Sequence, residues 1–372
     1  MRYFALLVLL SLFTVAGVDV STKNEASDYS ENRRHITFYN TYAYLDGEEW
    51  VIPARVWVHK QRRWLQSLTS WTIRIMGEYN PDQMQVFKRR ITDILADSKW
   101  RRTVSFRIGN DPEERVYRIK DRYGNELRTD RNGIVEGELR IPAEEAERLF
   151  GDNLAEDAYV KVYASSRRYS GTGTVRFMQP EGLSVISDID DTVKITEIPA
   201  GARIVVRNTF FKEYMPAPRM AEMYEEWEDA SFHYVSGSPW QLYRPLSGFL
   251  FSERAGFPVG TFHMKSARKN VLTISSWHDL REFITNENIT FEQKITQITQ
   301  IFEHFPGRQF IMVGDSGERD PEVYRAILEQ YPEQVKEIYI RDVVNDRELR
   351  PERLEDMTII PAPTILRGMT GK

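Results

Sequence analysis

Short runs of alternating polar and apolar residues recur between His35 and about Pro180, and this period of two predicts β-strands. Turn-forming pairs such as Asp46-Gly47 and Asn132-Gly133 separate the runs. The predicted strands are Ile36–Leu45, Glu49–His59, Arg102–Ile108, Arg115–Asp121, Ile134–Ile141, Ala158–Ala164 and Gly173–Met178. Residues 35–180 are therefore predicted to form a β-rich N-terminal domain, an antiparallel sandwich or barrel.

Two stretches with helical spacing of apolar residues interrupt the predicted strands. One contains Met84, Phe87, Ile91 and Ile94, and the other contains Trp64, Leu68, Trp71 and Ile75. The second follows the basic residues Lys60, Arg62 and Arg63. It is interpreted either as a helix packed on the sheet or as an amphipathic segment, Lys60–Met76, that lies on an anionic lipid surface.

The pattern changes after Gly182, where short apolar runs alternate with helical stretches. The predicted strands are Leu183–Ile189, Phe232–Val235, Phe310–Val313 and Val335–Ile340, and the predicted helices are Arg219–Trp227, Trp240–Glu253, Phe291–Phe305 and Asp320–Gln330. Such alternation predicts an α/β domain with a parallel, Rossmann-like sheet over residues 181–372. Ligands of such sheets bind beyond the carboxyl ends of the strands, so the residues that follow each strand are the candidate site.

The N-terminus is the only segment apolar enough to enter a membrane. Arg2, the apolar run Phe4–Ala16 and the small residue Gly17 are typical of a signal peptide over residues 1–17, followed by a flexible leader over 18–34. The run is shorter than the roughly 20 residues of a spanning helix, although retention as an anchor stays open. We therefore expect an exported protein, periplasmic or secreted, with peripheral membrane contact as a further option.

Composition narrows the chemistry. The chain has no Cys, which excludes disulfides, zinc–thiolate sites, iron–sulfur clusters and a cysteine nucleophile. Its 50 basic and 55 acidic residues give a formal charge of −5, which argues against nucleic acid as a partner. An exported chain without disulfides fits a bacterial envelope better than a eukaryotic secretory route.

Carboxylates concentrate where the first predicted strand of the α/β domain ends, at Asp188-Ile189-Asp190-Asp191-Thr192. A calcium-binding EF-hand loop would need Gly and Glu at the positions that Val193 and Pro199 occupy, so that interpretation fails. The alternatives from the residues alone are a solvated acidic loop, a helix cap or a site that needs a counter-charge.

The later strand ends carry further polar residues. Ser236-Gly237 precedes Pro239 at the start of a predicted helix, which makes either an anion cradle or an ordinary Ser cap. Gly314-Asp315-Ser316 and Asp320 follow the strand Phe310–Val313. Lys294 lies near the start of the preceding helix and is otherwise interpreted as a surface lysine.

In order and spacing, Asp188-x-Asp190-x-Thr192, Ser236, Lys294 and Gly314-Asp315-Ser316-x-x-x-Asp320 resemble the four motifs of the haloacid dehalogenase-like phosphatases. The surrounding sequence is similar to the narrower phosphatidate phosphatase catalytic-domain family, which is known from fungi and has many bacterial relatives. The segments that carry this similarity are Ser187–Lys194, Val235–Trp240 and Gly260–Lys265. The resemblance covers Leu183–Val343, somewhat under half of the chain.

The resemblance implies a role for each motif residue. Asp188 would be the nucleophile that forms an aspartyl phosphate, and Asp190 would transfer protons to the leaving group and from water. Ser236, Gly237 and Lys294 would bind the phosphoryl group together with Asp188. Mg²⁺ would be held by Asp188, the backbone carbonyl of Asp190, Asp315 and Asp320. Crowding by neighbouring carboxylates is expected to raise the pKa of Asp190.

The resemblance favours phosphatidate as the substrate, with diacylglycerol as the product. Aromatic residues in the segments Lys194–Pro218 and Leu246–Phe291 offer apolar surface for a lipid, although such residues more often form core. Two alternatives remain: a phosphatase of the same mechanism for another lipid or a soluble phosphomonoester, and a non-catalytic envelope binding protein on this scaffold. Acyl-chain preference, oligomeric state, protein partners and the purpose of the β-rich domain are not predicted.

Overall fold

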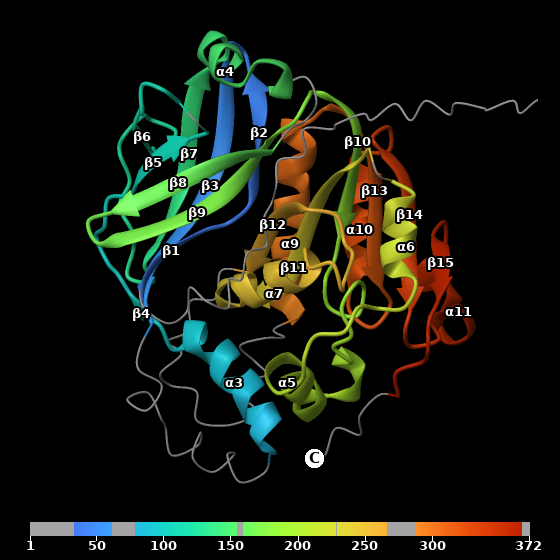
Figure 1. Ribbon diagram of the computed structural model, residues 1–372. Coiled ribbons are helices and arrows are strands. Elements are labelled where there is room, and N and C mark those ends of the chain that lie inside the picture. The colour runs from blue at the N-terminus through green and yellow to red at the C-terminus, as the bar shows by residue number, and fades with distance from the viewer. Residues whose placement is uncertain are drawn as a thin grey trace, which may run out of the picture. The chain divides into compact units, whose positions relative to one another are not determined.

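The computed structural model describes residues 33–61, 79–109, 111–154, 159–227, 229–265 and 287–366. The predicted signal peptide, most of the leader and nearly all of the amphipathic stretch Lys60–Met76 lie outside these ranges and stay predictions. Arg33–Lys372 forms one compact unit by its internal contacts. Within it the strands make two sheets, one from the N-terminal half and one from the C-terminal half (Figure 1). The proposed domain boundary at residue 180 stays a prediction.

Nine strands form the first sheet, as the alternating pattern predicts for a β-rich region. They are β1 (Arg34–Phe38), β2 (Thr41–Asp46), β3 (Glu49–Lys60), β4 (Asp97–Ser98), β5 (Ser105–Ile108), β6 (Tyr117–Arg118), β7 (Ile134–Pro142), β8 (Tyr159–Ser166) and β9 (Tyr169–Phe177). The main order is β1-β3-β2-β9-β8-β5-β6, with β4 and β7 on β3. The pairing is antiparallel except that β9 runs parallel to β1 and β2, so the expectation of a wholly antiparallel sheet is corrected.

The second sheet has six parallel strands in the order β12-β11-β10-β13-β14-β15. They are β10 (Glu181–Ser187), β11 (Ser231–Pro239), β12 (Gly260–Lys265), β13 (Gly307–Asp315), β14 (Val335–Asp342) and β15 (Thr358–Pro361). The chain starts in the middle at β10, moves outward to β12, and then crosses to β13 on the other side. The strand order therefore reverses between β10 and β13, and this switch point is where an open α/β sheet binds ligands.

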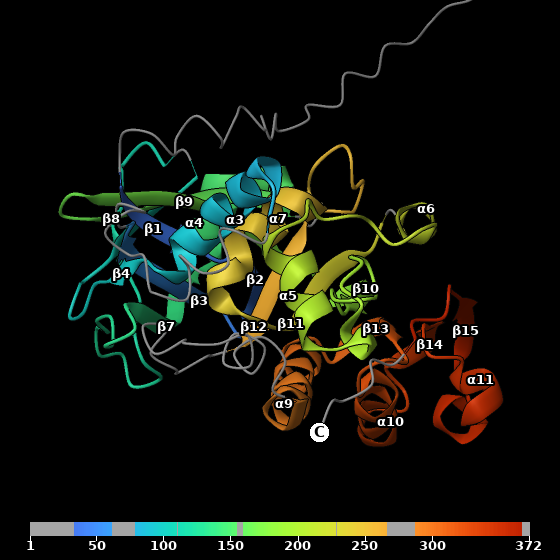
Figure 2. The same ribbon diagram turned by 90° about the horizontal axis from the view of Figure 1, so that it is seen from below.

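Helices cover both faces of the parallel sheet (Figure 2). One face carries α5 (Ala202–Phe210), α6 (Met220–Glu225) and α7 (Tyr243–Leu250), and the other carries α9 (Glu287–His304) and α10 (Asp320–Gln330). Alternate residues of each strand enter opposite cores, because successive side chains of a strand point to opposite faces. Val185 packs in the α5–α7 core, whereas its neighbour Ile186 packs in the α9–α10 core.

The helix α3 (Pro81–Ile94) begins at a capping box in which Asn80 and Gln83 exchange side-chain and backbone hydrogen bonds. Its apolar stripe, predicted from the spacing of Met84, Phe87 and Ile91, packs in the core that α5 also enters. Phe87 stacks on Phe211 with ring centroids 4.7 Å apart. Thus α3 lies between two strands of the N-terminal sheet in sequence, β3 and β4, but is built into the core beside the parallel sheet. The other α-helices of the described residues are α4 (Ala143–Phe150) and α11 (Asp346–Leu349).

Candidate active site

Asp188 lies directly beyond β10, at the switch point of the parallel sheet. Its backbone amide donates to the carbonyl of Val313 on β13, 2.9 Å away, so the ladder between the two strands extends to this residue. The side chain is only 1 % exposed. The apolar residues of β10 are buried in the core, so the carboxylate that follows them is buried as well. A buried carboxylate needs a compensating positive charge or hydrogen bonds.

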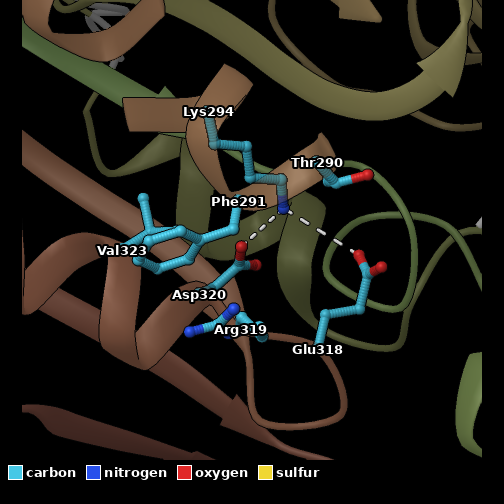
Figure 3. A pocket seen from close by; sticks show the side chains of 7 residues that line it. All are labelled: Thr290, Phe291, Lys294, Glu318, Arg319, Asp320 and Val323. Carbon is cyan, nitrogen blue, oxygen red and sulfur yellow. Dashed lines mark hydrogen bonds and ion pairs between the residues drawn. The ribbon is translucent and has the colours of Figure 1, made fainter. Parts of the chain in front are cut away.

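Lys294 supplies that partner from α9. Its ammonium is 2.7 Å from Oδ1 of Asp188. The same ammonium lies 2.5 Å from Oδ1 of Asp320 and 3.9 Å from Oε2 of Glu318 (Figure 3). Burial acts to lower the pKa of Lys294, but the three carboxylates together raise it well above its ordinary value. The lysine is therefore a fixed positive charge inside the protein and not the surface residue of the alternative interpretation.

Asp315 ends β13 and faces Asp188 across the switch point. Its Oδ1 accepts from the amides of Gly317 at 2.6 Å and Glu318 at 3.2 Å, while its own amide donates to Oδ2 of Asp320 at 3.2 Å. Gly314 permits this arrangement, because a Cβ there would lie 2.6 Å from Cβ of Asp320. Both oxygens of Asp320 are thus already engaged, one by Lys294 and one by the Asp315 amide.

The site fits a divalent cation. Oδ2 of Asp188 and Oδ2 of Asp315 are buried and have no hydrogen-bond partner among the described residues. Ligand oxygens of Asp188, Asp315 and Glu318 all lie within 4.8 Å of one another, an all-oxygen set of the kind that hard cations prefer. Burial, together with repulsion from nearby carboxylates such as Asp320, raises the pKa of each of these three carboxyls, although Lys294 opposes the shift at Asp188 and Glu318. A bound cation would stabilise the ionised form of these carboxyls and so lower their pKa values.

Asp190 has an environment of its own. Its Oδ1 lies 2.6 Å from the Lys194 ammonium and accepts from the Thr196 hydroxyl at 2.6 Å, and its Oδ2 accepts from the Ser238 hydroxyl at 2.9 Å. Burial acts to raise the pKa of Asp190, but Lys194 and the two hydroxyls outweigh it, and the net shift is downward. The expectation that crowding raises this pKa is therefore wrong, since Lys194 compensates the neighbouring acids.

Asp191, the third acid of the strand end, shapes the loop. It adopts a left-handed backbone with φ of 60°, and its carboxylate accepts from the amides of Thr196, Glu197 and Ile198 at 2.6–2.8 Å. Burial nevertheless raises its pKa. These bonds join Asp191 to the segment that leads into the 3₁₀ turn η3 (Ile198–Ala200).

Ser236 and Gly237 lie at the carboxyl end of β11, next to β10. Ser236 is fully buried, and its hydroxyl accepts from the amide of Ser238 at 3.0 Å. Gly237 packs against α9, where a Cβ would come within 2.6 Å of the Thr290 side chain. The predicted second motif therefore borders the helix that carries Lys294. The space beside Lys294, lined by Thr290, Phe291 and the α10 start, is about 10 Å³, enough for one water (Figure 3).

The structure brings together Asp188, Lys294, Asp315 and Asp320, as predicted, with Asp190 in the adjoining loop. Sequence reasoning assigned no role to Glu318, nor to Lys194, Thr196 and Ser238 around Asp190. Glu318 offered a signal, since it follows Asp315 by three residues in the loop that opens α10. The fold and site define an α/β protein with a buried, lysine-balanced acidic centre suited to a divalent cation.

Comparison with known proteins shows a similarity that is concentrated in the C-terminal part of the chain. Residues 183–342 match the family model described as "Phosphatidate phosphatase APP1, catalytic domain". The matched range begins in β10 and ends with β14, so it contains every residue of the centre described above.

Two fungal relatives extend the similarity beyond that range. Phosphatidate phosphatase APP1 of Saccharomyces cerevisiae is 31% identical over 226 residues, which are 59% of this chain and 36% of the relative. An uncharacterized protein of Schizosaccharomyces pombe is 27% identical over 211 residues, 54% of this chain and 30% of the relative. The chain thus spans about a third of the length of the curated relatives it matches.

Among solved structures, a carbohydrate esterase aligns with 84% of this chain and 89% of its own at 10% sequence identity. The TM-score is 0.22, a likeness too low to bear on fold or function.

Proposed function

We propose that this chain is a Mg²⁺-dependent phosphoric monoester hydrolase of the haloacid dehalogenase-like class, with phosphatidate as the favoured substrate. The observation that carries the proposal is the geometry of Asp188: one oxygen is held by Lys294 at 2.7 Å, and the other is buried without a hydrogen-bond partner among the described residues. A buried carboxylate oxygen without a hydrogen bond is unfavourable unless a bound ligand or cation contacts it. The family match over 183–342 supports the same activity.

Asp188 is the proposed nucleophile. Its carboxylate attacks phosphorus, the ester oxygen leaves as an alkoxide that takes up a proton, and an aspartyl phosphate results. Water then attacks the phosphorus, which releases inorganic phosphate and restores Asp188. Lys294 neutralises the charge of the nucleophile and the phosphoryl oxygens throughout, a preorganised electrostatic contribution. Ser236 and the Gly237 amide are the proposed phosphoryl ligands from the neighbouring strand.

Asp190 is the proposed proton carrier. Its lowered pKa keeps it ionised in the resting protein, which suits the second step, in which it accepts a proton from the attacking water. Donation to the leaving alkoxide in the first step requires that Asp190 first take up a proton. The hydroxyls of Thr196 and Ser238 lie within hydrogen-bond distance of the Asp190 carboxylate and can rotate to bond its protonated form.

Mg²⁺ is the proposed cofactor, and when bound it would neutralise charge on the phosphate so that a carboxylate can approach. Asp188, Asp315 and Glu318 are the side chains whose oxygens converge on one place. The backbone carbonyl of Asp190 remains a proposed ligand. Asp320 was proposed as a metal ligand from its motif. Its two oxygens accept hydrogen bonds from Lys294 and from the Asp315 amide, so its proposed role is to orient these two groups beside the Mg²⁺ site.

Phosphatidate is favoured because the yeast relative is named as a phosphatidate phosphatase. Export of the protein to the periplasm or cell exterior is likewise a proposal and rests on the N-terminal sequence alone. Among the described residues, no helix is both long and apolar enough to cross a membrane.

Phosphate release from phosphatidate, glycerol phosphate and nitrophenyl phosphate, each with Mg²⁺ and with a chelator, tests the proposal. We expect metal-dependent turnover with phosphatidate preferred. Turnover of the soluble esters alone would retain the mechanism and remove the lipid substrate. Binding without turnover of any ester would instead establish the non-catalytic binding protein.

A further inference from the structure

A second hollow is lined by residues of β5, of β6, of the turn between β8 and β9 and of nearby loops. Figure 1 shows β5 and β6 beside β8 at one side of the N-terminal sheet. The volume of the hollow is about 360 Å³. Five arginines line it, Arg101, Arg102, Arg118, Arg128 and Arg167, and the remaining lining side chains are all Ser or Thr. No carboxylate and no apolar side chain belongs to this lining of described residues.

The strand register builds the floor of this arginine hollow. Ser105 on β5 pairs with Arg118 on β6 and with Ser165 on β8, so the three side chains form one row on the same face of the sheet. The opposite face is the core, to which Phe106 and Ala164 contribute. The row therefore faces outward, with one guanidinium and two hydroxyls side by side.

Separate loops bring the other arginines to the same place. The Arg101 amide donates to the Thr129 carbonyl at 2.8 Å, and the Thr129 amide donates to the Arg102 carbonyl at 3.0 Å, which joins the segments of Arg101–Arg102 and Arg128. Arg101 and Arg167 both have φ of 54°, a left-handed conformation that is uncommon for a residue with a side chain. A glycine would adopt this backbone conformation more easily at both positions.

The charge of the hollow is hardly compensated. Within the described part of the chain, Arg118 has one weak ion pair, to Glu126 at 3.8 Å, and none of the other four arginines has a carboxylate within 4.0 Å. Nε of Arg102 is buried and lacks a hydrogen-bond acceptor. Arg140, in contrast, binds three acids on the same sheet. Five like charges collected in one hollow repel one another, and an anion bound between them would offset that repulsion.

We propose that the arginine hollow is a binding site for an anion that carries two or more phosphate groups. Guanidinium forks bind phosphate oxygens in bidentate pairs, and serine hydroxyls complete such contacts. The volume exceeds the needs of a single phosphate and lies in the range of small-molecule sites. Because the lining is wholly polar, it accepts a headgroup and excludes an acyl chain. The source is either a soluble polyphosphorylated compound or the headgroups of an anionic membrane.

Titration of the full chain with tripolyphosphate, in the presence of excess chelator, tests the site. Arg128→Gln with Arg167→Asn removes two exposed charges, and Asn tolerates the left-handed backbone at position 167. Arg122→Gln with Arg148→Gln is the matched control, since both residues are exposed and lie outside the hollow. We expect the hollow variant to weaken tripolyphosphate binding by about tenfold or more, with the control close to wild type and all three proteins unfolding at similar temperatures.

Equal affinity of the hollow variant and the wild type, or equal weakening in the control, would overturn the proposal. Co-sedimentation with phosphatidylcholine vesicles that contain phosphatidate then separates the two sources. Loss of sedimentation in the hollow variant but not in the control identifies membrane headgroups as the ligand. Tripolyphosphate binding without vesicle binding identifies a soluble ligand. Either result is independent of catalysis, because neither readout uses turnover.

Discussion

The ammonium of Lys294 in α9 lies 2.7 Å from Oδ1 of Asp188, which follows β10 and is 106 positions away in sequence. The same ammonium lies 2.5 Å from Asp320. One cation thus compensates two buried acids, and we expect Lys294→Met to lower turnover of nitrophenyl phosphate by about 100-fold or more. Without the cation the pKa of Asp188 rises further and its nucleophilic form is lost.

The control for Lys294→Met is the exposed Lys336→Met, which should retain wild-type turnover. Circular dichroism of both variants establishes that the fold is kept. Wild-type activity in a folded Lys294→Met protein would contradict the role given to this lysine.

Lys194 controls the ionisation of Asp190. In Lys194→Met the hydroxyls of Thr196 and Ser238 stay but the opposing charge at 2.6 Å is gone, so the pKa of Asp190 should rise. A base with a raised pKa is protonated at higher pH. With nitrophenyl phosphate, whose leaving group needs no proton, hydrolysis of the phosphoenzyme is the step that uses Asp190 as a base, and the acidic limb of kcat against pH should move upward by about one pH unit or more. The exposed Lys212→Met should leave the limb where it is. An unmoved limb in an active Lys194→Met enzyme would argue against Asp190 as the proton carrier.

Arg308 on β13 donates hydrogen bonds to residues at the start of the neighbouring strand β10 and to Ser231 of β11. Its buried guanidinium donates to the carbonyls of Gln179, Glu181 and Leu183 at 2.7–2.8 Å and to the hydroxyls of Ser184 and Ser231. Arg308→Met leaves these carbonyls buried without that donor, and we expect the free energy of unfolding to fall by roughly 3 kcal/mol. Urea unfolding measures this, with the exposed Arg122→Met expected to match wild type. A loss no larger than in that control would show that the bonds are replaced by others.

His304 should make stability depend on pH. Its Nδ1 lies 2.9 Å from the Tyr42 hydroxyl and its ring stacks on Tyr44. Burial lowers its pKa to about 4, although Asp46 acts in the opposite direction. The unfolded chain, with a histidine pKa of about 6.5, binds a proton that the folded protein does not, so acidification below that value favours unfolding.

Replacement of His304 by Gln removes this contribution. Between about pH 7 and about pH 5, the free energy of unfolding of His304→Gln should fall by roughly 2 kcal/mol less than that of wild type. The difference between the two proteins isolates the histidine from the buried acids, whose raised pKa values act with the opposite sign. Parallel losses in both proteins would show that His304 is protonated in the folded state.

Much of the α/β part could be predicted from periodicity and from turn residues. The helix Asp320–Gln330 has its predicted ends, since Pro321 and the acidic first turn mark its start. The placing of Asp188 and Asp315 at one edge was likewise expected, because parallel strands deliver their carboxyl ends to one edge. The place of Lys294 beside these acids was implied only by the family resemblance, since Lys294 lies in a helix and not at a strand end.

Other features depend on contacts that no local pattern encodes. The parallel pairing of β9 with β1 and β2 joins strands that are far apart in sequence. The packing of α3 on Phe211 likewise joins residues more than a hundred positions apart. The low pKa of Asp190 arises because a tight loop, held by Asp191, turns the Lys194 ammonium back onto it. Counting acids in the sequence could not reveal that compensation.

The central claim is that Asp188 becomes phosphorylated. With nitrophenyl phosphate the leaving group needs no proton, so Asp190→Asn should still form the phosphoenzyme. The variant should hydrolyse the phosphoenzyme more slowly than wild type, by roughly 10²–10⁴-fold. Mass spectrometry of the acid-quenched variant should then find about 80 Da added to the peptide that contains Asp188, and hydroxylamine should remove it. The double variant Asp188→Asn, Asp190→Asn should carry no label. A label on another residue, or turnover by Asp188→Asn at the wild-type rate, would contradict the account.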